Sequence, residues 1–277
     1  TTMAETRRLD STTTSITQTV EVRGSRRRTI MLSLIASAIL LGIWEIAARA
    51  YYQERKTLAP PTGAVRAVFT NWDAFPPHIS ATMFAAGKGW LIGNVIAIVC
   101  GVIAVLVPWT EQGFLQFAIT TYSMPLLAIG PILSSVFHGD VTKTALAAIA
   151  VCFTTMIGTI LGLRSADRVS LDLVRAYGGN RFTQLIKVRV PAALPTFFNA
   201  LRISAPAAVL GAILGDYAGG VDHGLGVMMV SSQFGANINL TWAIALVMTT
   251  LSLAGYLIIG LVGKRLTPWS ITSQGQS

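Results

Sequence analysis

RSADRVSLDLVRAYGGNRFTQLIKVRVPAALPT, residues 164–196, is a polar and basic interval between two long apolar runs. It contains a Gly-Gly pair at Gly178-Gly179, with a helix-forming pattern on each side. Its six cationic side chains are Arg164, Arg168, Arg175, Arg181, Lys187 and Arg189. Because charged residues are scarce elsewhere in the chain, we expect this interval to meet a partner rather than the bilayer core.

The composition of the whole chain is that of a membrane protein. Of the 277 residues, 52% are hydrophobic and only 12% are charged, about half the charge of a soluble domain. Several apolar runs reach the roughly 20 residues that a helix needs to cross a bilayer. Short alternating segments typical of a membrane β-barrel are absent from the sequence. The sequence therefore predicts an all-α, polytopic membrane protein.

The hydropathy pattern predicts six transmembrane helices within a membrane domain that covers residues 29–266. The expected spans are residues 30–48, 89–107, 114–137, 145–163, 198–217 and 242–262, with a cytoplasmic loop at 164–197. A Thr- and Arg-rich segment, residues 1–28, is predicted to be a flexible tail, and residues 267–277 a short C-terminal tail. Residues 61–75 predict an amphipathic helix ended by Pro76-Pro77, and the approach to the second span is predicted to lie in the interface.

The first apolar run has a competing interpretation as a signal peptide, because Ala48-Arg49-Ala50 resembles a small-x-small cleavage site. A signal core has 7–15 apolar residues, whereas this run is longer and contains Trp44 and Glu45. We therefore favour an uncleaved first span.

The distribution of lysine and arginine predicts the orientation. With the N-terminus inside, the inner segments hold 14 of the 21 cationic residues and the outer segments hold 6, while Arg202 lies in the fifth span. Cytoplasmic loops carry the excess of Lys and Arg in membrane proteins. Both termini and the interval 164–196 are thus predicted to be cytoplasmic.

Prolines interrupt two of the expected spans. Pro125 follows Ser123 and Met124 in the third span, and Pro206 lies in the fifth. A proline removes a backbone donor and bends a helix, which is tolerated at membrane depth where protein or a water-filled cavity surrounds the break. These residues are candidates for a translocation path, and a merely kinked packing helix is an equal alternative.

Asp216, at the outer end of the fifth span, is the best single ionisable candidate for this path. Ionisable groups within spans are costly and are functional hypotheses by default. Asp216 is expected either to pair with a cation across two copies of the chain, to line an outer gate, or to be an ordinary solvated helix end.

The basic interval itself predicts two short helices that meet at a glycine corner. Ser170 is the expected cap of the first helix, Gly178-Gly179 its end, and Asn180 the cap of the second, which Pro191 is expected to stop. A protrusion with Phe182 as an aromatic anchor and a basic rim suits a groove in another protein. An amphipathic surface on anionic lipid headgroups is the alternative.

The interval also resembles the cytoplasmic signature of binding-protein-dependent ABC importer permeases: an EAA triplet, a glycine four residues later, then I-x-L-P. Gly178 matches the glycine, while Val188, Val190 and Pro191 match the final pattern. The triplet departs from the family, with Asp172, Leu173 and Val174 in its place. The segment LAPPTGAVRAVF, residues 58–69, together with residues 162–165 and 224–226, resembles the sulfonate, taurine and nitrate branch.

This resemblance implies an importer permease fold with a cytoplasmic coupling helix that docks in an ATPase and moves a solute by alternating access. The implied partners are two ATPase subunits, a second permease copy or paralogue, an extracytoplasmic binding protein and the lipid bilayer. ATP and Mg²⁺ would be bound by the partner ATPase, with no cofactor and no catalytic residue in this chain. The implied location is a bacterial inner or plasma membrane. The implied solute is a small organic sulfonate such as taurine or a related small anion, and the alternative is a pyrimidine or vitamin precursor or another small organic acid. The predicted coupling residues are Asp172, Arg175, Ala176, Tyr177, Gly178, Gly179, Asn180, Arg181, Phe182, Leu185, Lys187, Arg189 and Pro191.

Other functional classes find little support. The cations cluster beside apolar runs rather than on a separate basic domain, which argues against nucleic-acid binding. The sequence has no phosphate-binding glycine loop and no ligand-like spacing of its Cys and His residues. A gradient-driven secondary transporter predicts internal repeats, and a membrane enzyme predicts a catalytic cluster. The pattern indicates neither.

Overall fold

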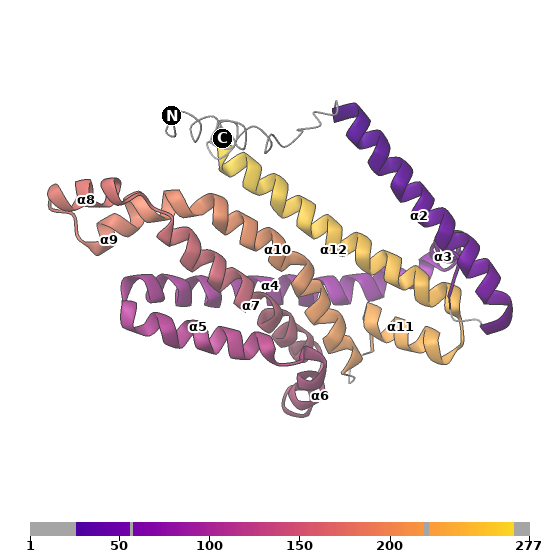
Figure 1. Cartoon of the computed structure of the whole chain (residues 1–277). Coiled ribbons are helices and arrows are strands. Elements are labelled where there is room, and N and C mark those ends of the chain that lie inside the picture. The colour runs from indigo at the N-terminus through magenta and orange to yellow at the C-terminus, as the bar shows by residue number, and fades with distance from the viewer. Residues whose placement is uncertain (1–25, 56–57, 219–221, 269–277) are drawn as a thin grey trace, which may run out of the picture.

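The computed structural model describes residues 26–55, 58–218 and 222–268, and all regular structure in these ranges is helical (Figure 1). Residues 1–25 of the expected N-terminal tail (1–28) and residues 269–277 of the expected C-terminal tail (267–277) lie outside the described residues, whereas Arg26–Arg28 belong to the first described helix. The helices are α2 Arg26–Arg55, α3 Pro61–Thr70, α4 Phe75–Leu106, α5 Pro108–Ser123, α6 Leu126–Val136, α7 Asp140–Arg164, α8 Arg168–Ala176, α9 Arg181–Gln184, α10 Val190–Tyr217, α11 Leu225–Phe234 and α12 Ile238–Leu266.

Five of these helices are long and apolar enough to cross a membrane: α2, α4, α7, α10 and α12. A sixth span arises if the bent pair α5 and α6 is counted as one. In Figure 1, α4, α5, α7, α10 and α12 form an elongated bundle, with α8 and α9 protruding from one end and α6 and α11 near the other. The all-helical membrane architecture expected from composition is therefore confirmed.

The chain breaks between α5 and α6, which meet at 95°. Met124 and Pro125 are extended at the break, and their backbone has left the helical region before Leu126 starts α6. Pro131 lies inside α6 without ending it. In the expected third span, Pro125 therefore separates two helices, whereas Pro131 does not.

The start of α4 differs from the expectation. Pro76 and Pro77 fall in its first turn, where backbone N–H groups have no intrahelical partner, so they begin this helix rather than ending α3. The predicted interfacial approach and the second span form one continuous helix of 32 residues. Lys88 lies within it, 4.1 Å from the centre of the Phe84 ring.

Helix α7 lies at the centre of the bundle, packed between α4 and α10, and small residues set the spacing. A Cβ on Gly93 of α4 would lie 2.4 Å from the Ala148 carbonyl oxygen. A Cβ on Gly211 of α10 would lie 2.6 Å from Ala147 Cα. Because glycine alone fits these contacts, the backbones approach as closely as small-residue interfaces allow in membranes.

A polar cluster joins the same three helices in the middle of the bundle. Thr155 of α7 donates to Asn94 Oδ1 of α4, and the Trp90 indole donates to Ser204 Oγ at 2.9 Å. The Asn94 amide also donates to the Trp90 carbonyl at 2.7 Å. These buried groups satisfy one another, as polar atoms away from water must. Asn94 is therefore a packing group in this chain.

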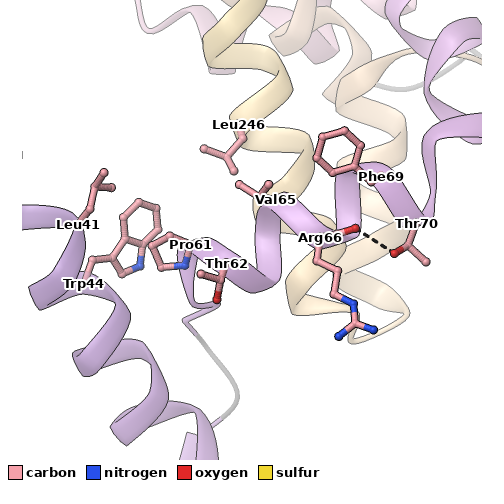
Figure 2. A pocket seen from close by; sticks show the side chains of 9 residues that line it. All are labelled: Leu41, Trp44, Pro61, Thr62, Val65, Arg66, Phe69, Thr70 and Leu246. Atoms are coloured by element: carbon pink, nitrogen blue, oxygen red, sulfur yellow. Dashed lines mark hydrogen bonds between the residues drawn. The ribbon is translucent and has the colours of Figure 1, made fainter. Parts of the chain in front are cut away.

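In Figure 1, α2 lies beside α3 and the start of α12, and the described contacts lie around Trp44 and Glu45. Glu45 caps α3 by accepting from Thr62 N at 3.1 Å and Thr62 Oγ1 at 2.7 Å. Trp44 packs on Trp242 with ring centres 5.2 Å apart. Figure 2 shows the open apolar groove of about 790 Å³ between α2, α3 and α12, lined by residues such as Val65 and Leu246. The apolar run of α2 is otherwise exposed.

Candidate functional site

The protrusion at one end of the bundle is built from α8, α9 and the turns beside them. Asp167, rather than the expected Ser170, caps α8: its carboxylate accepts from Ser170 N at 3.1 Å. Asn180 caps α9 as its position predicts, accepting from Thr183 N at 2.8 Å. The Gln184 amide donates to the Leu171 carbonyl at 3.2 Å, so the two helices are tied together side by side.

The corner between these helices is a Schellman motif. Gly178 has a φ of 79°, in the left-handed region that favours glycine, and its N–H donates to Arg175 O at 2.9 Å. The N–H of Gly179 donates to Val174 O at 2.8 Å. A Cβ on Gly179 would lie only 2.5 Å from Val174 Cγ1, so both glycines are needed. The glycine corner expected from the sequence is present, and it fixes the angle between the helices.

Gly178→Ala is expected to loosen this corner without disturbing the bundle, since a left-handed residue with a Cβ costs roughly 1–2 kcal/mol. Trypsin is a suitable probe because Arg175 and Arg181 flank the corner. Cleavage there should be several-fold faster than in the unaltered chain. Gly113→Ala in α5 is the matched control, because a Cβ there meets nothing within 4 Å. Equal cleavage rates for the two variants would contradict the role of the corner.

Pro191 does not end the second helix of the basic interval, because the chain stays helical through it. Residues Leu185–Arg189 form a π-helical turn, and α10 continues directly from Val190, whose N–H bonds to Leu185 O. Proline lacks the N–H that an interior position needs and its ring clashes with a carbonyl one turn back. The wider turn relieves that clash and places Pro191 in the first turn of α10. The protrusion is thus continuous with a bundle helix.

Three predicted coupling residues face the chain itself. Leu185 is buried and packs with Leu163 and Ala193. Arg181 donates to the Leu106 carbonyl at 3.3 Å, at the end of α4, and Arg189 donates to the Leu163 carbonyl at 3.1 Å, near the end of α7. Cations are favourable at helix C-termini, whose last carbonyls have no intrahelical donor. These residues therefore hold the protrusion on the bundle.

The remaining predicted residues lie outside on the protrusion. Tyr177 is 85% exposed and Phe182 is 61% exposed, and other large apolar side chains lie beside them on the same two helical segments. We name this surface the exposed apolar tip; it consists of Val169, Leu173, Tyr177, Phe182 and Ile186. The exposed residues around it are Arg168, Asp172, Arg175, Ala176, Asn180, Lys187 and Pro191. Apolar side chains at a charged tip are typical of a surface that another protein covers.

The candidate path residues do not form one cluster. Ser123, Met124 and Pro125 lie on the surface at the corner of α5 and α6, and the Ser123 hydroxyl donates within its own helix to Ile119 O. Pro206 is half-buried in α10, and Asp216 is buried. In the described part of the chain, no hydrogen bond joins the corner to either residue. Helix α6 instead packs on the end of α10, where Gly130 faces Ala218.

Asp216 is the centre of a buried polar node at the end of α10. Its side chain is fully buried, and Lys143 of α7, with a side chain 1% exposed, lies 3.4 Å from Asp216 Oδ1. Thr82 of α4 donates to Asp216 Oδ2 at 2.8 Å, and the backbone N–H of Gly226 donates to the same oxygen at 3.1 Å. Lys143 also pairs with Asp140 at 2.6 Å. The cation that Asp216 meets thus comes from its own chain, and the solvated helix end is excluded.

The node caps the first turn of α11 with side chains from other helices. The Leu225 N–H donates to Thr82 Oγ1 at 2.8 Å, and the Gly226 N–H donates to Asp216. Nδ1 of His78 lies 3.0 Å from Gly224 N and 2.9 Å from Gly224 O, so its tautomer decides which of them it bonds. A Cβ on Gly224 would lie 2.3 Å from Asp216 Oδ1. Because Gly224 and Gly226 have no side chains, the first turn of α11 can approach the Asp216 carboxylate.

Sequence reasoning missed Lys143, Thr82 and Gln184. In the sequence, Lys143 is only one of the six cations counted in the outer segments. Its position beside the predicted start of the fourth span nevertheless puts it at the same depth as Asp216. Thr82 has no sequence signal, because a threonine on an apolar helix is ordinary. Gln184 lies within the expected second helix of the basic interval, and its partner is a backbone carbonyl that the sequence does not specify.

Within the described residues, no three Asp, Glu, His or Cys side chains are grouped closely enough to hold a metal ion. The charged groups of the node are paired, and Arg202, the cation of the fifth span, donates to the Tyr256 hydroxyl and lies 4.3 Å from the centre of its ring. The two features that call for a function are the exposed apolar tip and the node that holds α11.

Curated relatives match most of the chain at modest identity. The "Probable ABC transporter permease protein" of Haemophilus influenzae is 26% identical and covers 87% of this chain and 98% of its own. The formylaminopyrimidine transport permease protein ThiX of Halalkalibacterium halodurans is 27% identical, and the match covers 83% of this chain and 92% of ThiX. The "Putative aliphatic sulfonates transport permease protein SsuC" of Bacillus subtilis is 23% identical, and the match covers 91% of this chain and 92% of SsuC.

Among solved structures, an inward-facing conformation of the MetNI methionine ABC transporter contains a chain that matches with a TM-score of 0.52 at 18% identity. The match covers 75% of this chain and 96% of the other, and it supports the fold alone. A family model described as "Binding-protein-dependent transport system inner membrane component" matches residues 93–268, more than half of the chain. This protein therefore belongs to that family: it is a multi-pass inner-membrane permease subunit of an ABC transporter, without a cofactor, and ATP is bound and hydrolysed by a partner subunit.

Proposed function

We propose that the chain is a six-span importer permease with both termini and the α8–α9 protrusion in the cytoplasm. The excess of cations on the segments that this orientation places inside supports it. The node around Asp216 and helix α11 then lie on the outer side. The bent pair α5 and α6 serves as the third span, with its right-angled corner surrounded by protein in the assembled transporter.

The exposed apolar tip is the single observation that carries the coupling function. Its aromatic side chains stand on two short helices, which the Schellman corner and the Gln184 bond hold rigid. A preorganised surface loses little entropy on binding, and buried aromatic anchors supply most of the affinity at interfaces. We propose that the tip docks in a groove of an ATPase subunit, with the surrounding cations at the rim. Adsorption on lipid headgroups is the alternative outcome of the test below.

The proposed complex contains two ATPase subunits, a second copy or paralogue of this permease, and an extracytoplasmic binding protein that delivers the solute. ATP-driven approach of the ATPases would move the docked protrusions and switch the permeases between inward- and outward-facing states. Membership in the family also argues against a gradient-driven secondary transporter, because ATP in the partner subunit supplies the energy.

Phe182→Ala is expected to lower binding-protein-stimulated ATP hydrolysis by at least about tenfold, because hot-spot aromatics contribute 2 kcal/mol or more at interfaces. The measurement is ATPase activity of the transporter reconstituted in liposomes. Phe117→Ala is the matched control, since Phe117 is similarly exposed (67%) but lies on α5. Unchanged stimulation in Phe182→Ala would contradict docking and favour the lipid alternative.

For the solute, we propose a small organic sulfonate such as taurine, with a formylaminopyrimidine-type vitamin precursor as the second candidate. Relatives named for sulfonate or taurine transport match 60–91% of the chain, and the formylaminopyrimidine permease matches 83% of it at similar identity. Because the binding protein selects the solute in the proposed mechanism, its thermal unfolding with each compound is the appropriate test. Stabilisation by formylaminopyrimidine and not by taurine would reverse the order.

A further inference from the structure

Helices α7 and α10 are fastened to each other at both ends. At the protrusion end, Arg189, in the turn that leads into α10, donates to the Leu163 carbonyl of α7 at 3.1 Å. At the opposite end, Lys143 of α7 pairs with Asp216 of α10 at 3.4 Å in a fully buried position. The first connection is a charge-assisted hydrogen bond, and the second is a buried ion pair.

Close backbone packing fills the length between these two connections. A Cβ on Gly158 of α7 would lie 2.3 Å from Ala200 Cβ, and one on Gly215 of α10 would lie 2.5 Å from Lys143 Cα. Such contacts leave no room for a side chain to rearrange, and packed interfaces resist gradual sliding. Helices α7 and α10 therefore form one rigid unit, about 40 Å long from the 28 residues of α10.

Helix α11 is joined to the far end of this unit by its first turn. Asp216 of α10 accepts the N–H of Gly226, and Thr82 of the neighbouring helix α4 accepts the N–H of Leu225; these N–H groups have no intrahelical partner. The carboxylate also lies at the positive end of the α11 dipole. Lys143 extends the connection by donating to the His223 carbonyl, just before α11, at 3.1 Å. Asp216 is part of the rigid unit, and its carboxylate also contacts the first turn of α11.

We infer that α7 and α10 act as a lever that carries movement of the docked protrusion to α11, and that Asp216 is the positioning residue joining α11 to this lever. The inference rests on the proposed coupling function and extends it to the outer face. The protrusion runs into α10 without a break, since the π-helical turn keeps the chain helical through Pro191. Displacement at the protrusion therefore reaches Asp216 through one helix, and α11 moves with it.

The test is hydrogen–deuterium exchange of the permease assembled with its ATPase subunits, nucleotide-free and trapped with ADP and vanadate. In the unaltered protein, peptides from both α8–α9 and α11 should change protection between the two states. In Asp216→Ala, the α8–α9 peptides should still respond, whereas the α11 peptide should exchange about 10- to 100-fold faster in both states and lose its response.

Asp222→Asn is the matched control, because Asp222 is exposed and belongs to the same connection but not to the node. Thr82→Val serves if Asp216→Ala fails to assemble: it removes one hydroxyl and should raise α11 exchange by about tenfold. An α11 response in Asp216→Ala equal to that of the unaltered protein would overturn the lever, as would an α11 peptide that never responds while α8–α9 does. No response of α8–α9 in the unaltered protein would instead refute the coupling function.

Discussion

Lys143→Met is expected to destabilise the folded permease by about 3–5 kcal/mol, because it leaves the buried carboxylate of Asp216 without its cation. Burying two charges is costly, and the attraction between them offsets that cost only while both are present. Lys143 is 1% exposed in its side chain, so water cannot replace it. The measurement is unfolding in mixed detergent and dodecyl sulfate micelles, followed by the loss of native tryptophan fluorescence.

The double variant Lys143→Met with Asp216→Leu separates the loss of the pair from the loss of packing. An apolar pair of similar volume is often tolerated in place of a buried ion pair, so the double variant should be more stable than Lys143→Met. Recovery should be partial, because Thr82 and Gly226 lose their common acceptor. Lys88→Met, at an exposed cation, should change stability by less than about 0.5 kcal/mol. A double variant that merely adds the two single losses would refute direct coupling.

Gly211→Val is expected to prevent accumulation of folded permease. The new Cβ alone would lie 2.6 Å from Ala147 Cα and 2.7 Å from the Leu146 carbonyl oxygen, and both are backbone atoms that cannot turn aside. Overpacking costs about 1–3 kcal/mol where side chains can adjust, and more where they cannot. The two additional methyl groups of valine increase this cost. Because α7 lies between α4 and α10, separating α10 from it also disturbs the polar cluster at Asn94.

The measurement is the monodisperse fraction in size-exclusion chromatography of detergent-solubilised protein, before and after mild heating. Gly211→Ala should show an intermediate loss. Gly87→Val in α4 is the matched control, since a Cβ there meets nothing within 4 Å and the helix should accept it. Equal monodisperse fractions for Gly211→Val and Gly87→Val would show that the α7–α10 contact can open.

The architecture was predictable because its causes are local or additive. Apolar runs of sufficient length identify membrane helices whatever their packing, and Gly178 could be placed because only a left-handed residue closes that corner. Pro125 likewise marked the break between α5 and α6. Proline was a weaker guide elsewhere: Pro76 begins a helix and Pro191 lies within one, because its effect depends on the hydrogen-bonding pattern around it.

The candidate site was less predictable because pairings across the bundle have no local signal. Leu185 and Phe182 are both apolar residues in the same segment, yet one is buried and the other exposed, and only the position of α7 distinguishes them. Arg189 has a helix C-terminus as its partner, and a sequence does not show which helix ends lie within reach. Asp216 was identified as unusual by its type and depth, while its partner 73 positions earlier became visible only in three dimensions.

The π-helical turn at Leu185–Arg189 sets the rotational phase between the two ends of the permease. An α-helix advances about 100° per residue, so one residue more or fewer in this turn would rotate everything before it by roughly that angle about the axis of α10. Leu185 would leave its pocket beside Leu163, and the surface that carries Phe182 would point in another direction. In this protein, the length of the turn is thus as strongly constrained as the chemistry of its side chains.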